Sequence, residues 1–420
     1  MTAPMTAPMT ATARPSTKDT NRARLIRQLR RYGPMARVAL TRRTRLSAGA
    51  VSAITGELIE EGILCELAPP APVEGAAGSR GRPPVELGLN PDHGRVAAVS
   101  IRMNLIEGVV ADFSGRAIAR HAVVCQTRSL DAAGVIERCA QAIDGALERV
   151  PGQVIRAIGL AAQGMVDPGT GRQLWSPVLR TGSMDLAAPV AARFGVPVLV
   201  ENDAAATSLA VVRDVPDLQR GLVAVLMLGH GVGMGLLRDG GAFPGSRGFS
   251  SEIGHVRRLP GGAQCRCGQR GCIEAYLADY ALYRDGRSLA DLPHTDSQQP
   301  TEEHMVELAR RAEAGEPGLL ALYQEAGVAL ADAISIVGSV LAPRRIVVTG
   351  SGLRAFRLME PTFRSALARA FAPGLVPERD VLFVPGGVER ITAGMAHLAL
   401  EAVDAGLAER PDRQAFSAAG

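Results

Sequence analysis

The alternation of short β-branched runs with helical stretches restricts the fold more than any other feature of this sequence. It begins near residue 85 and continues to about residue 400. Short β-branched runs are typical of buried strands, and several are separated by stretches with helical periodicity. This pattern predicts an α/β architecture with ligands at the carboxyl ends of strands. The predicted strands are 95–103, 106–113, 155–162, 196–203, 221–228, 234–240 and 344–352, and the predicted helices include 131–149, 304–313 and 319–341.

The first part of the chain follows a different pattern. Residues 21 to about 67 are expected to form three short helices, and apolar residues recur at helical spacing in the third. Ser47 is suited to cap the start of that third helix, and Gly62 is suited to end it. The following residues 68–84 are rich in proline, glycine and alanine, which predicts a wing or a flexible linker. Together these features fit a helix-turn-helix with a wing.

Positive charge is concentrated in the same part of the chain. The net charge is only +4, but residues 22–45 contain nine arginines and no acidic residue. A basic module favours a polyanionic partner such as DNA. The alternative for the three helices is a dimerisation bundle with a solvated arginine face. The alternative for the segment that contains Arg80 and Arg82 is a linker with incidental arginines. The predicted DNA contacts are Ser47, Ala48, Ser52 and Thr55 near base edges, Arg42, Arg43 and Arg45 beside phosphates, and Arg80 and Arg82 in a minor groove.

The absence of long apolar runs and the scattered cysteines predict the cellular compartment. No run of about 18 or more uncharged apolar residues occurs, and residues 1–20 form a polar repeat that we expect to be a disordered tail. Cys65, Cys125 and Cys139 are scattered singly in apolar stretches, as packed thiols are. These observations favour a cytoplasmic protein with no membrane partner and no disulfide scaffold.

The remaining cysteines form a cluster that calls for its own explanation. His255, Cys265, Cys267 and Cys272 are spaced H-x9-C-x-C-x4-C, which supplies one nitrogen and three thiolates for a tetrahedral zinc site. A disulfide between Cys265 and Cys267 would be strained and would be reduced in the cytosol. Four protein ligands leave no open position for water, so the expected zinc is structural rather than hydrolytic.

Three segments together resemble the ROK family, the repressors, open reading frames and sugar kinases that share an actin-like fold. They are "SEIGHVRRLPGGAQCRCGQRGCIEAY", "VENDAAATSLA" and "MLGHGVGMGLL", and the similarity extends over roughly residues 90–405. The segments "GELIEEGIL" and "GRPPVELGLNP" resemble the winged helix of the family's repressor branch. The resemblance implies a winged helix-turn-helix domain over 21–88, a two-lobed sugar-kinase (ribonuclease H-like) domain over 89–410 with its zinc loop at 255–272, and a tail over 411–420.

The resemblance also implies roles for individual residues. In the kinases of the family, the residue matching Asp203 is the general base, and a carboxylate near a sugar hydroxyl can take its proton as the oxygen attacks a γ-phosphate. Two further acids, Glu252 and Glu274, lie next to the predicted zinc ligands in the sequence and could accept hydrogen bonds from sugar hydroxyls. The residues implied to bind the sugar are Asn202, Asp203, Glu252, His255 and Glu274.

The first phosphate loop departs from the family's D-x-G-x-T-K pattern. The matching stretch here is "SIRMNL", residues 100–105, with Ser100 in place of the acid. Arg102, Met103 and Asn104 replace the glycines and the threonine, so side chains fill space that only bare backbone could yield to phosphates. The second loop keeps its glycines but contains His230. Asp203 is therefore expected to be a vestigial base, and the protein is not expected to be an enzyme.

The expected function is a ROK-family regulator, a repressor that binds operator DNA and responds to a sugar in a degenerate kinase pocket. The alternatives are an ATP-dependent hexose or N-acetylhexosamine kinase and a purely structural interaction protein. A symmetric operator predicts a homodimer or homotetramer. The retained acids favour an unphosphorylated sugar unless an arginine lies near them. Val178 stands where the family commonly has a sugar-contacting asparagine.

Overall fold

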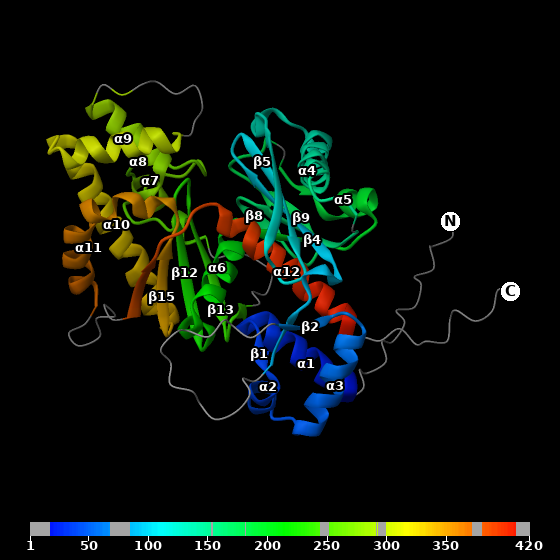
Figure 1. The fold of residues 1–420 in the computed structure, drawn as a ribbon. Helices are drawn as coiled ribbons and strands as arrows, with labels where there is room; N and C mark the ends of the chain where they lie inside the picture. Colours follow the sequence, from blue (N-terminus) through cyan, green and yellow to red (C-terminus); the bar gives the residue numbers. More distant parts are fainter. Residues whose placement is uncertain are drawn as a thin grey trace, which may run out of the picture. The chain divides into compact units, whose positions relative to one another are not determined.

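The computed structural model describes residues 17–67, 85–152, 154–180, 182–243, 252–290, 292, 300–371 and 380–408. The chain divides into two compact units. The first unit combines residues 1–93 with residues 401–420, and the second comprises residues 94–400. Figure 1 shows the elements of each unit along the chain. Both units contain apolar side chains that are fully buried, such as Leu25 in the first and Val225 in the second.

The first unit has the element order of a winged helix-turn-helix. Its helices pack around buried leucines, and its strands form one antiparallel sheet in the order β1-β3-β2. Helix α1 begins at Thr17, so the tail predicted for residues 1–20 ends earlier than expected. The elements are α1 (Thr17–Tyr32), β1 (Met35–Ala36), α2 (Arg37–Thr44), α3 (Ala48–Glu60), β2 (Leu64–Leu67) and β3 (Glu86–Leu89).

The ends of α3 form as the sequence predicts. The hydroxyl of Ser47 accepts a hydrogen bond from the amide of Ala50 at 3.2 Å, which caps the first turn. Gly62 follows the last turn with φ +70°, a conformation that favours glycine. Strands β2 and β3 then pair as the two sides of a wing. The residues 68–84 that connect them, including Arg80 and Arg82, lie outside the described residues.

The first lobe of the second unit is built on a five-stranded mixed sheet in the order β11-β7-β4-β5-β6. The predicted helix of residues 131–149 is α4, and it packs its apolar face on this sheet through residues such as Val135 and Ile143. Strand β6 was not predicted because its residues alternate irregularly between buried and exposed at the sheet edge. The elements are β4 (Arg95–Arg102), β5 (Leu105–Asp112), β6 (Ala117–Val124), α4 (Ala132–Leu147), β7 (Ile155–Ala162), β8 (Met165–Asp167), β9 (Arg172–Trp175), β10 (Met184–Asp185), α5 (Ala187–Phe194) and β11 (Val198–Asn202).

The second lobe is built on a second five-stranded sheet, in the order β14-β13-β12-β15-β16. Alternate residues of β12 face opposite sides: Leu226 packs towards α10, and Val225 packs towards α6. The elements are α6 (Asp203–Asp214), β12 (Leu222–Leu228), β13 (Val232–Arg238), β14 (Gly241–Ala242), α7 (Glu274–Leu277), α8 (Asp279–Leu289), α9 (Glu302–Glu313), α10 (Pro317–Leu341), β15 (Arg345–Thr349), α11 (Phe356–Ala370) and β16 (Val381–Val384).

Helix α10 is the one described helix that is long and apolar enough to cross a membrane by length and composition. Half of its apolar window is buried inside the protein, however, and it packs extensively against α11. Residues such as Tyr323 and Leu330 belong to the core of the second lobe. This burial accounts for the apolar composition of α10 as that of a core helix.

Helix α12 (Glu389–Ala408) belongs to both units, because the second unit ends at Leu400 and residues 401–420 cluster with the first. Within the first unit, Asp404 accepts hydrogen bonds from Nε and Nη2 of Arg30 on α1 at 2.8 and 2.7 Å. The Arg30 side chain is only 1% exposed and that of Asp404 is 13% exposed. The end of α12 therefore joins the helical unit, whereas the sequence-based boundary placed residues up to 410 in the sugar-binding domain.

Candidate functional site

All five residues that the family resemblance implies for sugar binding line one cavity of the second unit. The chain reaches this cavity from the carboxyl end of β11, from the start of α6 and from the loop that precedes α7. Carboxyl ends of parallel strands are the usual position of ligands in α/β folds. The cavity residues in question are Asn202, Asp203, Glu252, His255 and Glu274.

Asn202 is the N-cap of α6. Its Oδ1 accepts hydrogen bonds from the amides of Ala204 and Ala205 at 2.8 and 3.2 Å. Its Nδ2 donates to the carbonyl of Gly164 at 2.8 Å, which ties α6 to the segment after β7. Since an asparagine amide has two N–H groups, one N–H remains for a ligand. The cap thus fixes the orientation in which Asn202 faces the cavity.

Asp203 is the first residue of α6 and is only 6% exposed. Burial raises its pKa to about 7, although hydrogen bonds from Gln163 and from the amide of Ala204 oppose this shift. The negative charge of Glu252 contributes to this rise in the pKa of Asp203. A carboxyl group with a pKa near neutrality can hold or release a proton at physiological pH.

Glu252, His255 and Glu274 reach the same cavity from the segment that leads into α7 and from the first residue of α7. Glu274 is buried, and its Oε2 accepts a hydrogen bond from the amide of Val232 at 3.1 Å. Nε2 of His255 lies 3.7 Å from Oε2 of Glu252. Nδ1 of the same ring lies 3.6 Å from Sγ of Cys265. His255 therefore belongs both to the cavity wall and to the cysteine cluster.

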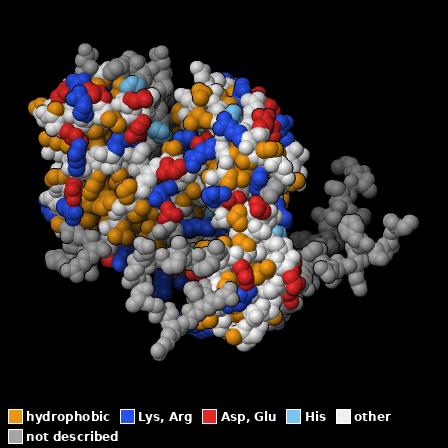
Figure 2. Space-filling model, viewed as in Figure 1, with side chains coloured by type: hydrophobic (Ala, Val, Ile, Leu, Met, Phe, Trp, Pro, Cys, Tyr) orange, Lys and Arg blue, Asp and Glu red, His pale blue; other side chains and the backbone are white. Residues whose placement is uncertain are grey.

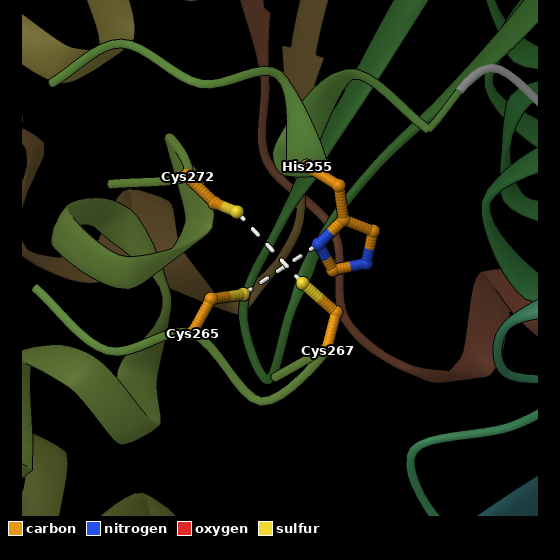
Figure 3. Close-up of side chains that lie close together, drawn as sticks. All are labelled: His255, Cys265, Cys267 and Cys272. Atoms are coloured by element: carbon orange, nitrogen blue, oxygen red, sulfur yellow. Dashed lines mark hydrogen bonds between the residues drawn. The ribbon is translucent and has the colours of Figure 1, made fainter. Parts of the chain in front are cut away.

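The His255, Cys265, Cys267 and Cys272 side chains converge on one point, as Figure 3 shows. Their candidate ligand atoms all lie within 4.8 Å of one another. The sulfurs of Cys267 and Cys272 are 3.8 Å apart. A tetrahedron with metal–sulfur bonds of about 2.3 Å has edges of about 3.8 Å, so this spacing fits a bound ion. The cluster could hold a metal, as its spacing in the sequence predicts.

In the absence of a metal, the thiols of the cluster differ in pKa. Burial, together with the charge of a Cys265 thiolate, raises the pKa of Cys272 to about 12. Burial also opposes ionisation of Cys265, but hydrogen bonds from His255 and Tyr280 outweigh it and bring that pKa down to about 7. A divalent cation would remove the mutual repulsion of the thiolates and favour their ionisation together.

The backbone of the loop holds these ligands in place. Isolated β-bridges pair Arg257 with Cys272 and Gln264 with Arg270. Gly271 has φ +82°, and a Cβ atom there would lie 1.8 Å from the carbonyl oxygen of Leu259. Only glycine fits this position, so the turn itself requires the glycine that precedes Cys272 in the motif.

The sequence analysis missed several residues of the cavity wall, among them Gln163, Trp175 and Arg266. The ring of Trp175 meets that of His255 edge to face, with centroids 6.0 Å apart. Trp175, the single tryptophan of the chain, could have been proposed as a sugar contact because aromatic faces commonly pack against sugars. Its distance from the cysteine loop in the sequence, however, gives no indication that the two lie together. Val178 is only 1% exposed and belongs to the core of the first lobe.

The segment that matches the first phosphate loop forms the tight hairpin between β4 and β5. Arg102 pairs with Leu105, so only Met103 and Asn104 make the turn, and Asn104 has φ +59°. The hydroxyl of Ser100 is buried without a hydrogen-bond partner. Arg102 lines a second cavity, and this cavity adjoins the first because Asp203 and His230 line both.

The residues predicted to contact DNA differ in their exposure. Ser47, Ala48 and Ser52 are exposed on α3 and at its cap, and Arg42, Arg43 and Arg45 are exposed before it. Arg43 stacks over the ring of Tyr32 at 3.9 Å. Thr55 is 0% exposed, and its hydroxyl accepts a hydrogen bond from Nε of Arg37 at 3.1 Å. The prediction for Thr55 is therefore wrong, because it lies one turn beyond Val51 on the buried face of the helix.

The fold and the site define a class: a two-lobed α/β sugar-kinase-like domain with a loop of one histidine and three cysteines, joined to a helical unit with a wing. The chain belongs to the ROK family, whose model matches residues 96–401. The DNA-binding transcriptional dual regulator NagC of Escherichia coli (strain K12) is 24% identical over 361 residues, which cover 83% of this chain and 85% of that protein.

Solved structures show the same fold. A ROK family transcriptional regulator, a homologue of the E. coli MLC protein, aligns with a TM-score of 0.74 and 23% identity over 93% of this chain and 98% of its own. A ROK family glucokinase from Streptomyces griseus, in complex with glucose and AMPPNP, aligns with a TM-score of 0.61 and 25% identity over 73% of this chain and 99% of its own. The regulator covers the helical unit as well as the two lobes, whereas the kinase covers less of the chain.

Proposed function

We propose that this protein is a transcriptional regulator, a repressor that binds operator DNA and responds to a sugar bound in the cavity of the second unit. The observation that carries the proposal is the helical unit joined to a ROK domain. Its helix α3 presents an exposed polar N-terminus, and exposed arginines precede it. The similarity to NagC extends over most of both chains and supports the same conclusion.

In the proposed complex with DNA, the N-terminal half of α3 enters the major groove. Ser47, Ala48 and Ser52 contact base edges, and Arg42, Arg43 and Arg45 bind phosphates on either side. None of these three arginines has an acidic partner among the described residues. Arg80 and Arg82 of the wing remain proposed minor-groove contacts on sequence grounds alone.

The sugar is held between the two walls of the cavity. Asn202 offers its remaining N–H, and Asp203, Glu252 and Glu274 offer carboxylate oxygens to sugar hydroxyls. Nε2 of His255 lies beside Glu252 and is the fifth group proposed to contact the sugar. A set of carboxylates around a neutral polyol is a common means of binding it, because each hydroxyl can donate to a charged acceptor.

The metal of the histidine–cysteine cluster is proposed to be zinc, since zinc prefers tetrahedral sites of thiolate and imidazole. His255, Cys265, Cys267 and Cys272 would hold it, and its role would be to fix the loop. With four protein ligands, no position remains open for substrate chemistry. This arrangement supports a sensor rather than a metal-dependent hydrolase.

A kinase is the second candidate function, because Asp203 keeps the position and the raised pKa of a general base beside glycine turns. The hairpin at residues 102–104 opposes it. Arg102 lines the cavity next to Asp203, and its side chain takes space that the family's loop leaves to phosphates. We therefore rank the regulator first and the hexose or N-acetylhexosamine kinase second.

We also propose that the protein is cytoplasmic and forms a homodimer or homotetramer. Figure 2 shows apolar side chains gathered on the surface over α10 and α11, and Val340 of α10 is 74% exposed. An exposed apolar patch on a soluble protein commonly marks an interface. A two-fold assembly would also match the symmetry of an operator.

Fluorescence anisotropy with a labelled fragment of the protein's own promoter tests the regulator. We expect the protein to bind this DNA specifically and a sugar to release it. The Glu274→Gln variant should still bind the DNA, but the sugar should no longer release it. A coupled assay for ADP release with glucose or N-acetylglucosamine tests the kinase. Turnover far above background without specific DNA binding would contradict the proposal.

A further inference from the structure

Three arginines of the first unit form ion pairs with acids that are distant in the sequence. The pairs are Arg22 with Glu61, Arg30 with Asp404 and Arg37 with Glu66. The side chains of Arg22 and Arg30 are buried, at 4% and 1% exposure. Arg37 differs from them, because its side chain is 35% exposed and that of its partner is 51% exposed.

Arg37 connects three elements of the first unit. It is the first residue of α2 and directly follows β1. Its Nε donates a hydrogen bond to the hydroxyl of Thr55 on α3 at 3.1 Å. Its Nη1 and Nη2 both donate to Oε1 of Glu66 on β2 at 3.2 Å. The planar guanidinium group therefore bridges the helix that is proposed to read DNA and the first strand of the wing.

Thr55 carries this contact to the part of α3 that is proposed to face the bases. Thr55 is fully buried, and its hydroxyl also donates to the carbonyl of Ser52 at 3.2 Å. Ser52 is exposed and is a proposed base contact. The connected contacts thus run from Glu66 through Arg37 and Thr55 to the turn of α3 that presents Ser52.

Glu66 belongs to the sheet of the wing and not to the helices. It is paired with Leu87 of the central strand β3, and Leu87 is paired in turn with Met35 of β1. β1 and β2 are therefore the two edges of this sheet. Since Arg37 follows β1, its ion pair with Glu66 fixes the far edge of the sheet relative to the start of α2.

The stability of the unit does not account for an arginine at this position. A positive charge at the start of a helix is opposed by the helix dipole, and the first turn of α2 contains no acidic residue. An ion pair as exposed as that of Arg37 with Glu66 contributes little to folding. What the contacts of Arg37 do determine is the angle between α3 and β2, two elements of the DNA-binding unit.

We propose that Arg37 is a positioning residue for operator recognition, which holds α3 and the wing strand β2 in the orientation in which both fit one DNA site. The inference rests on the proposed function, because it concerns the DNA-binding surface of the same unit. Contacts to base edges carry the sequence information, whereas contacts to phosphates are shared by all sequences. Loss of the bridge should therefore reduce specificity more than it reduces binding to DNA in general.

Fluorescence anisotropy with the full-length protein tests the inference. The probes are a labelled fragment of the protein's own promoter and an unrelated duplex of the same length. Arg37→Lys keeps the positive charge but lacks the planar fork that reaches two partners. This variant should bind the promoter fragment about tenfold more weakly and the unrelated duplex within about twofold of the natural protein. Thr55→Val, which removes the hydroxyl and keeps a branched side chain, should have the same effect.

Glu66→Gln separates positioning from charge. It removes a negative charge from a unit that is proposed to bind a polyanion, so electrostatics alone would tighten binding to both DNAs. Loss of the bridge should instead weaken binding to the promoter fragment several-fold. Glu60→Gln is the matched control, because it makes the same change of charge at an exposed position at the end of α3. It should leave the ratio of the two affinities unchanged.

Two further measurements complete the test. The double variant of Arg37→Lys with Glu66→Gln should lose no more specificity than Arg37→Lys alone, because both changes act on one bridge. Arg37→Ala should leave the salt dependence of binding to the unrelated duplex unchanged. A direct phosphate contact of Arg37 would lower that slope by about 0.9. Thermal unfolding and retained binding to the unrelated duplex show that each variant is folded.

The inference is overturned if Arg37→Lys and Thr55→Val keep the natural ratio of affinities, or if Glu66→Gln tightens binding to the promoter fragment. A reduced salt slope for Arg37→Ala on both DNAs would also overturn it and would make Arg37 a phosphate contact. These outcomes leave the proposed function standing, because the natural protein still prefers its promoter. If the natural protein shows no such preference, the proposed function fails and this inference fails with it.

Discussion

Nε2 of His255 lies 3.7 Å from Oε2 of Glu252, on the edge of the imidazole ring that faces the cavity. Nδ1 of the same ring faces Cys265 in the metal cluster. One side chain thus joins the candidate metal centre to the candidate sugar site. The position of His255 in the cavity wall should therefore depend on whether the metal is bound.

Loss of the metal is expected to weaken effector binding. Cys272→Ser removes a buried ligand, so the bound metal should be lost and His255 should no longer be held against the wall. Because His255 lines the effector cavity and is also a candidate metal ligand, effector affinity should fall together with metal content. Metal content by mass spectrometry and effector titration are the measurements. Cys65→Ser, in β2 of the other unit, is the control, and full effector affinity in metal-free protein would contradict this expectation.

The stability of the second unit should depend on pH through Asp203. Because burial raises its pKa from an ordinary value near 4 to about 7, ionisation of this carboxyl costs folding stability as the pH rises through that interval. Asp203→Asn removes the cost. Its stability relative to the natural protein should increase between pH 4 and 7 towards a limit of about 4 kcal/mol, then stay constant.

Urea unfolding of the two proteins at a series of pH values measures this difference. The exposed Glu137→Gln on α4 is the matched control and should show no such trend. A pH-independent difference for Asp203→Asn would show that the carboxyl does not titrate in this range in the folded protein.

The arginines before α3 should determine the salt dependence of DNA binding. Each of Arg42→Ala, Arg43→Ala and Arg45→Ala should weaken binding to operator and unrelated DNA alike. Each should reduce the slope of log affinity against log salt by about 0.9, because one phosphate contact is lost. Arg364→Ala on α11 is the control, since this exposed arginine pairs with Glu360. Unchanged slopes in all three variants would exclude the proposed docking.

The pair between Arg30 and Asp404 should contribute strongly to the first unit. Asp404→Ala removes the carboxylate that accepts two hydrogen bonds from the 1% exposed Arg30, which is expected to lower the free energy of unfolding by about 1.5 to 3 kcal/mol. The double variant Arg30→Met with Asp404→Leu should recover most of this loss. Chemical unfolding is the measurement.

An exposed ion pair provides the comparison for that prediction. Asp144 pairs with Arg193 at 2.9 Å, and both side chains are more than 40% exposed. Asp144→Ala should cost less than about 1 kcal/mol. Equal losses for Asp404→Ala and Asp144→Ala would mean that Arg30 finds water or another partner once the carboxylate is removed.

Much of the fold could be predicted because its local signals agree with its packing. The strand pattern located β4, β7 and β12 because most residues of each strand are buried and apolar on both faces. The edge strand β6 lacked that signal. Helix α12 was also not predicted, and its membership of two units depends on the pairing of Asp404 with Arg30, which are 374 residues apart in sequence.

The site was predicted unevenly for a similar reason. The metal ligands and acids lie in motifs whose spacing carries chemical meaning, so His255 and Glu274 could be named from the sequence. Trp175 and Gln163 reach the cavity only through the tertiary fold. Thr55 was misassigned because a polar residue near the start of a helix can also point inward and bond to a neighbour, here Arg37.

The continuity of α12 has a mechanical consequence. Its first turn follows Gly387 and Val388, which line the cavity beside Arg102, and its last residues include Asp404 in the helical unit. A helix of this length extends about 30 Å and resists stretching along its axis. The segment that links the two units along the chain at residue 400 is therefore a helix and not a flexible loop.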